Sequence, residues 1–162
     1  MIKQDYLMQM ILKFFNALVK AREKHEKDPL EAAESLEDAI TAATDIDGVA
    51  LLALAPESIA SVVQVAGIDP VVVRYIAGSM MLEGVYLREA GDASTAALRE
   101  AQAQALADAF DFDLPADPAD FEGMKADIEK EFDVTFEEAD RLVNGPSEAD
   151  ALDLDQFPWL NA

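Results

Sequence analysis

The side chains best suited to proton transfer and metal binding at neutral pH are scarce in this chain. It contains one histidine, His25, and no cysteine. The lack of cysteine excludes disulfides, thiolate nucleophiles and thiolate metal sites, and a single histidine excludes a multi-histidine metal site. His25 lies between Lys24 and Glu26, where a charged histidine near a helix C-terminus is favoured by the helix dipole. We interpret it as a surface histidine with no catalytic role.

Carboxylates are abundant, and two acidic clusters resemble the start of a calcium-binding loop. They are residues 45–48 (DIDG) and residues 111–113 (DFD). In the first cluster, Leu54 stands where the bidentate glutamate is required, and in the second, Ala116 replaces the required glycine. We therefore expect no specific metal site at either cluster.

The sequence also lacks the short motifs that bind phosphate or activate a serine. It has no P-loop, no Gly-x-Gly-x-x-Gly dinucleotide fingerprint and no Gly-x-Ser-x-Gly elbow. Pairs of carboxylates occur because acidic residues are frequent, so their spacing identifies no acid–base pair. The sequence therefore predicts a protein that is not an enzyme and has no cofactor.

The charge balance is strongly acidic and unevenly distributed. Asp and Glu number 33 and Lys and Arg 12, for a net charge of −21, so nucleic acid is an unlikely partner. Residues 1–27, however, hold six basic and three acidic residues. Three interpretations remain open: a solvated acidic surface, docking of this basic segment on the acidic remainder, or its binding to an anionic partner.

Hydropathy gives no sign of a membrane protein. No stretch reaches the roughly 18 uninterrupted apolar residues of a membrane span, and charged or polar residues interrupt the apolar N-terminus too early for a signal peptide. The lack of cysteine is compatible with a reducing compartment. We expect a bacterial cytoplasmic protein that does not enter a membrane.

Helical periodicity and helix start signals cover almost the whole chain. Asp-Pro pairs at 28–29, 69–70 and 117–118 are expected to open helices, because Asp caps the first turn and Pro suits its first position. The predicted helices cover about residues 4–24, 29–45, 56–67, 71–90, 93–110, 118–132 and 135–144, with a short apolar run at 49–55. The sequence predicts an all-α fold, a single compact domain of six or seven helices over residues 1–145, followed by an acidic aromatic tail over 146–162.

The helix predicted over 56–67 has its apolar residues close together. We expect Ile59, Val62, Val63 and Val65 to face inward. The valines alone would suit a strand, but no second strand is available to pair with it. A helix is therefore predicted here.

The two helices at 71–110 form a hairpin with small residues at defined places. The residues that set its packing and its turn are Gly84, Leu87, Gly91, Asp92, Ala96 and Ala103. This pattern resembles one tetratricopeptide repeat, a helix–turn–helix unit of about 34 residues. Glu83 and Glu100 depart from it, because apolar residues are usual at both positions. Only one copy is found, so the resemblance implies a single repeat-like hairpin.

The opening of the chain carries a second resemblance. Asp5, Tyr6, Leu7, Met8, Met10 and Ile11 are similar to the start of a small bacterial family of uncharacterised all-helical proteins that contain a tetratricopeptide-like body. The resemblance implies a fold and no activity, and it transfers no catalytic residue.

The apolar arc of the first helix is wider than a surface helix needs, which suggests that a second surface covers it. A homodimer through this helix is the simplest explanation. The candidate interaction residues are Tyr6, Met10, Phe14, Phe15, Arg74, Tyr86, Phe157 and Trp159. The last two belong to the tail, which either docks on a partner or folds back on its own domain.

We predict a non-enzymatic protein–protein interaction or scaffold module that uses a helical groove. The alternative is a small-ligand-binding or enzymatic protein with a pocket near Arg74, Tyr75, Glu83 and Tyr86. A buried Glu83–arginine pair in a cavity would favour the alternative, and a flat apolar groove would favour the interaction module. Arg74 and Arg88 are expected to form surface ion pairs with Glu83 or Glu89.

Overall fold

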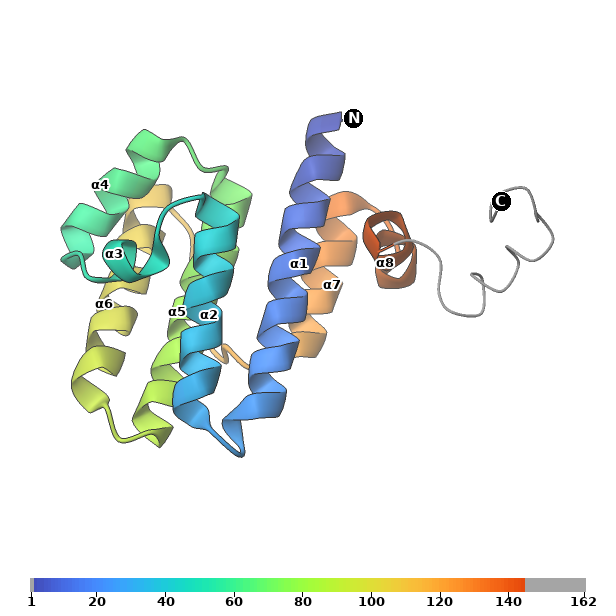
Figure 1. Cartoon of the computed structure of the whole chain (residues 1–162). Coiled ribbons are helices and arrows are strands. Elements are labelled where there is room, and N and C mark those ends of the chain that lie inside the picture. The colour runs from blue at the N-terminus through green and yellow to red at the C-terminus, as the bar shows by residue number, and fades with distance from the viewer. Residues whose placement is uncertain (1, 145–162) are drawn as a thin grey trace, which may run out of the picture. The chain divides into compact units, whose positions relative to one another are not determined.

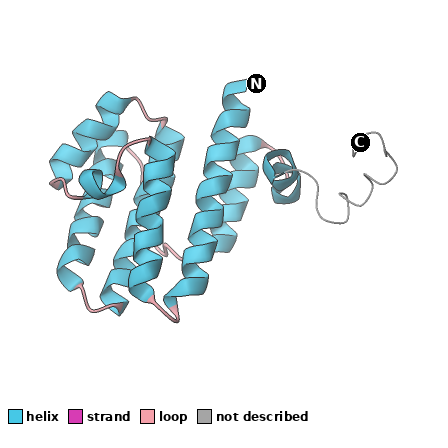
Figure 2. Cartoon of the chain, in the orientation of Figure 1, coloured by secondary structure: helices cyan, strands magenta, loops and turns pink. Residues whose placement is uncertain are grey.

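The computed structural model describes residues 2–144, and all regular structure in this range is helical (Figures 1 and 2). The helices are α1 (Ile2–His25), α2 (Pro29–Thr44), α3 (Gly48–Leu52), α4 (Pro56–Ala66), α5 (Pro70–Glu89), α6 (Ala93–Phe110), α7 (Phe121–Phe132) and α8 (Phe136–Asn144). Among these, all but the short α3 and α8 have eleven or more residues. The predicted all-α fold is confirmed, with six substantial helices.

The chain divides into two compact units. One is Lys13–Phe121, and the other combines the described residues of Met1–Leu12 and Glu122–Ala162. No helix within residues 2–144 combines the length and the hydropathy that a membrane span requires. The predicted domain boundary at residue 145, and the tail at 146–162 with Phe157 and Trp159, lie outside the described residues and stay predictions.

In the unit Lys13–Phe121, α5 is the central helix. It packs against α2 and against α6, and α4 packs against α6 (Figure 1). The side chains that fill the space between them are almost all aliphatic and fully buried, and their burial supplies most of the favourable free energy of folding in this unit. The largest are Leu36, Ile40, Leu51, Leu52, Ile59, Ile76, Met80, Leu82 and Leu106.

The smaller unit contains α7 and α8, joined by a short connection. The Phe136 N–H donates to Glu129 Oε2 at 2.9 Å, and the Lys125 ammonium lies 5.2 Å from the Phe136 ring centre. Thr135 Oγ1 accepts the Glu138 N–H at 3.2 Å, the cap expected from that spacing. Local hydrogen bonds therefore define where α8 begins.

Two of the three Asp-Pro pairs open helices as predicted. Asp28 Oδ1 accepts the Glu31 N–H at 3.0 Å, and Asp69 Oδ1 accepts the Val71 N–H at 2.9 Å. The third prediction is wrong. Asp117 Oδ1 accepts the Ala119 N–H, but residues 117–120 form a turn, and α7 begins only at Phe121.

The buried Phe121 ring explains where that turn ends. Its centre lies 6.1 Å from that of Phe15, edge to face, and the Arg22 guanidinium lies 4.4 Å above the ring. These contacts are made by residues far away in the sequence, so they are invisible to a local cap signal. The helix α7 therefore begins at the residue whose ring is buried by these tertiary contacts, Phe121, and not at Pro118.

The prediction for α4 is correct in type and partly wrong in orientation. Ile59 and Val63 are buried, but Val62 is 37% exposed and Val65 is 89% exposed. At 3.6 residues per turn, residues 63 and 65 point about 200° apart, so they cannot both face the core. The apolar run of α4 therefore leaves valine side chains on the surface.

The α5–α6 hairpin turns where the sequence predicts. Gly91 has φ +89°, a conformation that glycine adopts without a Cβ penalty, and Asp92 Oδ1 accepts the Thr95 N–H at 3.1 Å to cap α6. A Cβ added at Gly84 would lie 3.5 Å from the Ala96 carbonyl oxygen, so α5 and α6 approach closely there.

Replacing Gly48 by alanine is expected to lower the free energy of unfolding by about 1–3 kcal/mol. A Cβ at Gly48 would lie 2.6 Å from the Glu37 carbonyl oxygen of α2, and the Gly48 N–H donates to Thr41 Oγ1 at 2.6 Å. Urea unfolding measures the change. Gly78→Ala in α5 is the control, because a Cβ there meets nothing within 4 Å, and its better helix propensity should stabilise the chain slightly. Equal effects of the two substitutions would contradict the proposed close contact between α2 and α3.

Candidate functional site

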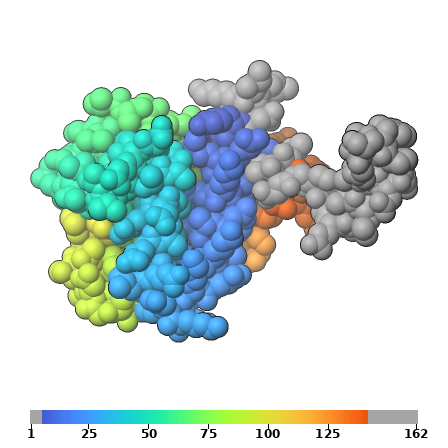
Figure 3. Space-filling model, viewed as in Figure 1, coloured from blue at the N-terminus to red at the C-terminus, as the bar shows by residue number. Residues whose placement is uncertain are grey.

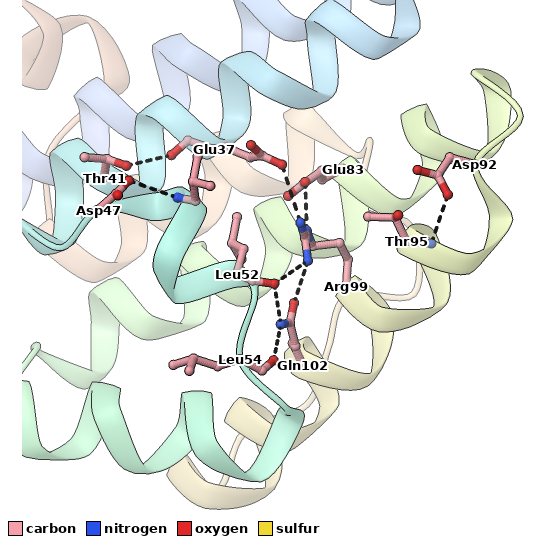
Figure 4. Close-up of polar contacts among 11 residues, drawn as sticks. Glu37, Thr41, Asp47, Leu52, Leu54, Glu83, Asp92, Thr95, Arg99 and Gln102 are labelled. Carbon is pink, nitrogen blue, oxygen red and sulfur yellow. Dashed lines mark hydrogen bonds and ion pairs between the residues drawn. The ribbon is translucent and has the colours of Figure 1, made fainter.

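A cluster of polar side chains, three of them buried and Glu37 half-buried, lies among the helices of the unit Lys13–Phe121 (Figure 4). Glu37 comes from α2, Glu83 from α5, and Arg99 and Gln102 from α6. Glu83 and Gln102 are 0% exposed and Arg99 is 7% exposed. Charged groups are buried at this depth only when they are paired, so each of their partners has to be identified. We call these four residues the Arg99 cluster.

Arg99 is the centre of the cluster. Its Nε donates to Glu83 Oε1 at 2.8 Å, and its Nη1 donates to the Leu52 carbonyl oxygen at 2.8 Å and to Gln102 Oε1 at 3.1 Å. Its Nη2 donates to Glu37 Oε1 at 3.4 Å. One planar guanidinium therefore bonds to groups of α2, α3, α5 and its own helix, a use to which its fixed fork of donors is suited.

Gln102 extends the cluster to the connection between α3 and α4. Its Nε2 donates to the carbonyl oxygens of Leu52, at 2.9 Å, and of Leu54, at 2.7 Å. The Leu52 carbonyl ends α3, and such terminal carbonyls have no partner within their helix. Arg99 and Gln102 satisfy it instead, and they can do so together because residues three apart share one face of a helix. The cluster thus fixes the backbone that leads into α4.

Glu83 has the most perturbed environment in the cluster. Burial raises its pKa from 4.5 to about 8, the charge of Arg99 opposes this shift, and the neighbouring Glu37 carboxyl adds to it. Its Oε2 is the one buried side-chain nitrogen or oxygen atom in the described part of the chain that has no hydrogen-bond partner. The Glu83 carboxyl can therefore keep its proton near neutral pH. When Glu83 is neutral, the positive charge of Arg99 faces one negative carboxylate, that of Glu37.

The acidic runs that resemble calcium loops lie at helix ends. Asp45, at φ 57°, ends α2, and Asp111, at φ 56°, ends α6. Asp47 Oδ1 accepts the Val49 N–H and caps α3. Within residues 2–144, no group of three or more His, Asp or Glu side chains is placed to hold a metal ion. Asp45 and Asp111 end their helices through backbone N–H groups that donate to the Thr41 and Ala107 carbonyls, whereas Asp47 caps α3 through its carboxylate.

His25 makes more contacts than the sequence indicated. Its ring stacks on that of Tyr86 with centres 4.7 Å apart, and its Nδ1 lies 3.0 Å from Glu89 Oε2. Burial, together with the Glu89 charge, raises the pKa of Tyr86 to about 12. The expected surface histidine is thus half-buried, and it joins the end of α1 to the end of α5.

The four residues of the predicted pocket do not share one environment. Glu83 faces α2 and α6, whereas Tyr86 stacks on α1, although both lie on α5. Arg74 is exposed and Tyr75 is half-buried. Glu83 and Tyr86 are three positions apart and point about 60° away from each other on α5, so neighbouring helices supply them with different partners.

The predicted interaction residues of the first helix also separate. Tyr6 is exposed and Met10 half-buried, but Phe14 and Phe15 are buried, as is the candidate Tyr86 on α5. Of the residues named for the packing and turn of the hairpin, Gly84, Leu87, Ala96 and Ala103 are buried, and Gly91 and Asp92 form the turn.

The predicted partner of Arg88 is wrong. Its Nε and Nη2 donate to the two carboxylate oxygens of Glu100, each at 3.0 Å, on the exposed side of the α5–α6 hairpin. Residues one and five positions away on a helix do not face each other well, whereas α6 brings Glu100 alongside. The sequence did not indicate a role for Arg99; its one local signal is the spacing of three to Gln102 in an alanine-rich helix.

The second notable feature is the exposed face of α4. Ser58, Ser61, Val62 and Val65 lie at helical spacing and are all exposed, and the Ser61 hydroxyl donates to its own helix at the Glu57 carbonyl. We call these four residues the α4 face. Residues 48–68 contain a single charged residue, Glu57, in a chain of net charge −21. The segment is drawn in teal to green in Figure 3. This uncharged face differs sharply from the acidic composition of the rest of the chain.

The chain is a small all-helical protein whose distinctive features are the Arg99 cluster and the α4 face. Compared with known proteins, it has no match: no protein-family model, no curated protein and no solved structure is significantly similar to it.

Proposed function

We propose that this chain is a non-enzymatic protein–protein interaction module and that the α4 face is its binding surface. The observation that carries the proposal is the exposure of Val62 and Val65 within a segment that has one charged residue. Interface centres are depleted in charged side chains relative to the remaining surface, and apolar groups exposed together favour association. An uncharged face is therefore the part of this acidic surface best suited to bind a partner.

The Arg99 cluster supports this proposal from inside the unit. Gln102 and Arg99 hold the carbonyl groups of Leu52 and Leu54, immediately before α4 begins at Pro56. A surface that is fixed before binding loses less conformational entropy when its partner binds. The cluster would thus preorganise the α4 face.

The α5–α6 hairpin would be the scaffold, and its resemblance to one tetratricopeptide repeat is part of the proposal. Gly84 and Ala96 permit the close approach of the two helices, and Gly91 makes the turn. Glu83 and Glu100, which depart from the repeat pattern, are the carboxylates that pair with Arg99 and Arg88. The departures therefore have a physical role in this chain.

We also propose that the opening residues resemble a family of bacterial helical proteins and that the chain is cytoplasmic. A further proposal is a homodimer through the first helix. For that dimer, α1 offers the exposed Tyr6 and the half-buried Met10, because Phe14 and Phe15 are already buried. Val65 of the α4 face is the most exposed large apolar side chain in the described residues, at 89%, so we place the binding surface there.

The ligand-binding alternative has one observation in its favour, the buried Glu83–Arg99 pair and the raised pKa of Glu83. A ligand site also needs polar atoms that are free to bind. In the described part of the chain, the buried side-chain nitrogen and oxygen atoms other than Glu83 Oε2 all have partners. We therefore keep the interaction module as the proposed function.

The proposal is tested by placing the photo-crosslinking residue p-benzoylphenylalanine at position 65 and irradiating the cells that produce the protein. We expect a discrete adduct heavier than the chain, which mass spectrometry resolves into this chain and its partner. The matched control is the same residue at position 85, because Val85 of α5 is also exposed, at 40%. Equal adducts at both positions, or none at position 65, would contradict binding through the α4 face.

A further inference from the structure

We propose that the α4 face binds a cationic amphipathic helix, a segment with apolar residues along one side and lysine or arginine beside them. This inference rests on the proposed function and adds the chemistry of the partner. It depends on three properties of the surface: its apolar centre, its acidic surroundings and its lack of basic residues.

The apolar centre has the spacing of a helix ridge. Val62 and Val65 are three residues apart and exposed, so their side chains lie on neighbouring turns of α4. The Ser61 hydroxyl, one residue before Val62, donates to the Glu57 carbonyl of its own helix. A partner helix packs such a ridge into the groove between its own side chains, with apolar anchors at a spacing of three to four residues.

The charges around the α4 face are acidic along the chain in both directions. Glu57 lies in the first turn of α4, and Asp69 follows its C-terminal end. Residues 28–73 contain nine acidic residues and no lysine or arginine, and the next basic residue is Arg74 of α5. Charge complementarity across an interface selects the partner and speeds its association, so basic flanks fit this surface.

The same charges argue against a second copy of this chain as the occupant. A two-fold dimer through the α4 face would bring the same surface of both copies together. Glu57 and Asp69 of one copy would then approach the corresponding carboxylates of the other, and each chain carries a net charge of −21. A heterologous, basic partner avoids this repulsion.

The experiment uses the full chain and two synthetic peptides of about 18 residues, five helical turns. Both have leucine at positions i, i+3, i+4 and i+7; one has lysine at the remaining positions and the other has glutamate. Fluorescence anisotropy of the labelled peptides measures their binding. We expect the lysine peptide to bind, more weakly as salt screens the charges, and the glutamate peptide not to bind.

Variants locate the binding. Val62→Ser with Val65→Ser should weaken binding of the lysine peptide by about tenfold or more, and Val65→Lys should weaken it further by repulsion. Val85→Ser, at the exposed valine of α5, should leave binding unchanged. All of these positions are exposed, and circular dichroism with thermal unfolding checks that each variant is folded. If the lysine peptide bound the Val62 and Val65 variants as tightly as the wild type, it would be attracted to the acidic surface elsewhere, and the inference would be overturned.

Two other results would overturn it as well. One is the lack of binding by either peptide, and the other is a concentration-dependent dimer in light scattering that Val62→Ser with Val65→Ser abolishes, which would make a second copy the occupant. The crosslink at position 65 tests the proposed interaction module separately from the proposed cationic helix. A specific adduct with a partner, without peptide binding, would leave the interaction module standing and reject the cationic helix.

Discussion

Replacing Arg99 by methionine is expected to lower the free energy of unfolding by about 3–5 kcal/mol, whereas Arg88→Met should lower it by no more than about 1 kcal/mol. Both arginines join α5 to α6 through a glutamate. Arg99 is buried and also bonds to the Leu52 carbonyl, so its loss leaves buried polar atoms without partners. Arg88 and Glu100 are exposed, and water replaces their contact. Urea unfolding of the two variants measures the difference.

A double substitution separates loss of the ion pair from loss of volume. Arg99→Met combined with Glu83→Leu replaces both polar side chains by apolar ones of similar size. Such replacements of a buried pair are often neutral or stabilising, so the double variant should recover much of the stability lost in Arg99→Met. If instead Arg99→Met and Arg88→Met had equal effects, the Arg99 cluster would not hold the helices together as we describe.

The free energy of unfolding is expected to fall as the pH rises between 4.5 and about 8, the two pKa values of Glu83 in the unfolded and folded chain. In this range the folded chain holds a proton on Glu83 that the unfolded chain has released. Unfolding therefore releases a proton, and a rising pH favours the unfolded state, by up to about 1.4 kcal/mol per pH unit. Arg99 and Glu37 are the charged groups that face Glu83 from the neighbouring helices. Urea unfolding at a series of pH values measures the slope.

Glu83→Gln should remove this dependence on pH. The glutamine does not titrate, its oxygen can accept from Arg99 Nε as Glu83 Oε1 does, and its amide can donate towards Glu37 as a protonated carboxyl would. The matched control is Glu34→Gln, at an exposed glutamate of α2, which makes the same change of charge and should keep the wild-type slope. Parallel curves for the wild type and Glu83→Gln would show that Glu83 does not hold the proton.

The helix starts that the sequence predicted correctly depend on residues close together in the chain. Asp28, Asp69 and Asp92 cap their helices through hydrogen bonds to N–H groups two or three residues ahead. Because these bonds are local, residue type and spacing identify them. Asp117 has the same local bond but begins a turn, and the start of α7 coincides with the distant contact of Phe121 with Phe15.

The candidate site, by contrast, is formed by residues that lie far apart in the sequence. Arg99 is 16 positions from Glu83, 47 from Leu52 and 62 from Glu37. No local periodicity links these residues, and the expected surface pairs of Arg88 show how a short-range rule fails when another helix supplies the partner. Glu83 is unusual in the sequence for its place in the hairpin, but nothing local indicates which arginine pairs with it.

The sequence by itself determined that the chain is helical, where most of its helices begin and end, and that cysteine and multi-histidine chemistry are excluded. Helix caps, turns and composition act over a few residues, so they can be read along the chain. Only the tertiary structure decided which charges are buried together and that Val62 and Val65 face outward. Those outcomes depend on how α2, α4, α5 and α6 pack, because burial and pairing are properties of several helices at once.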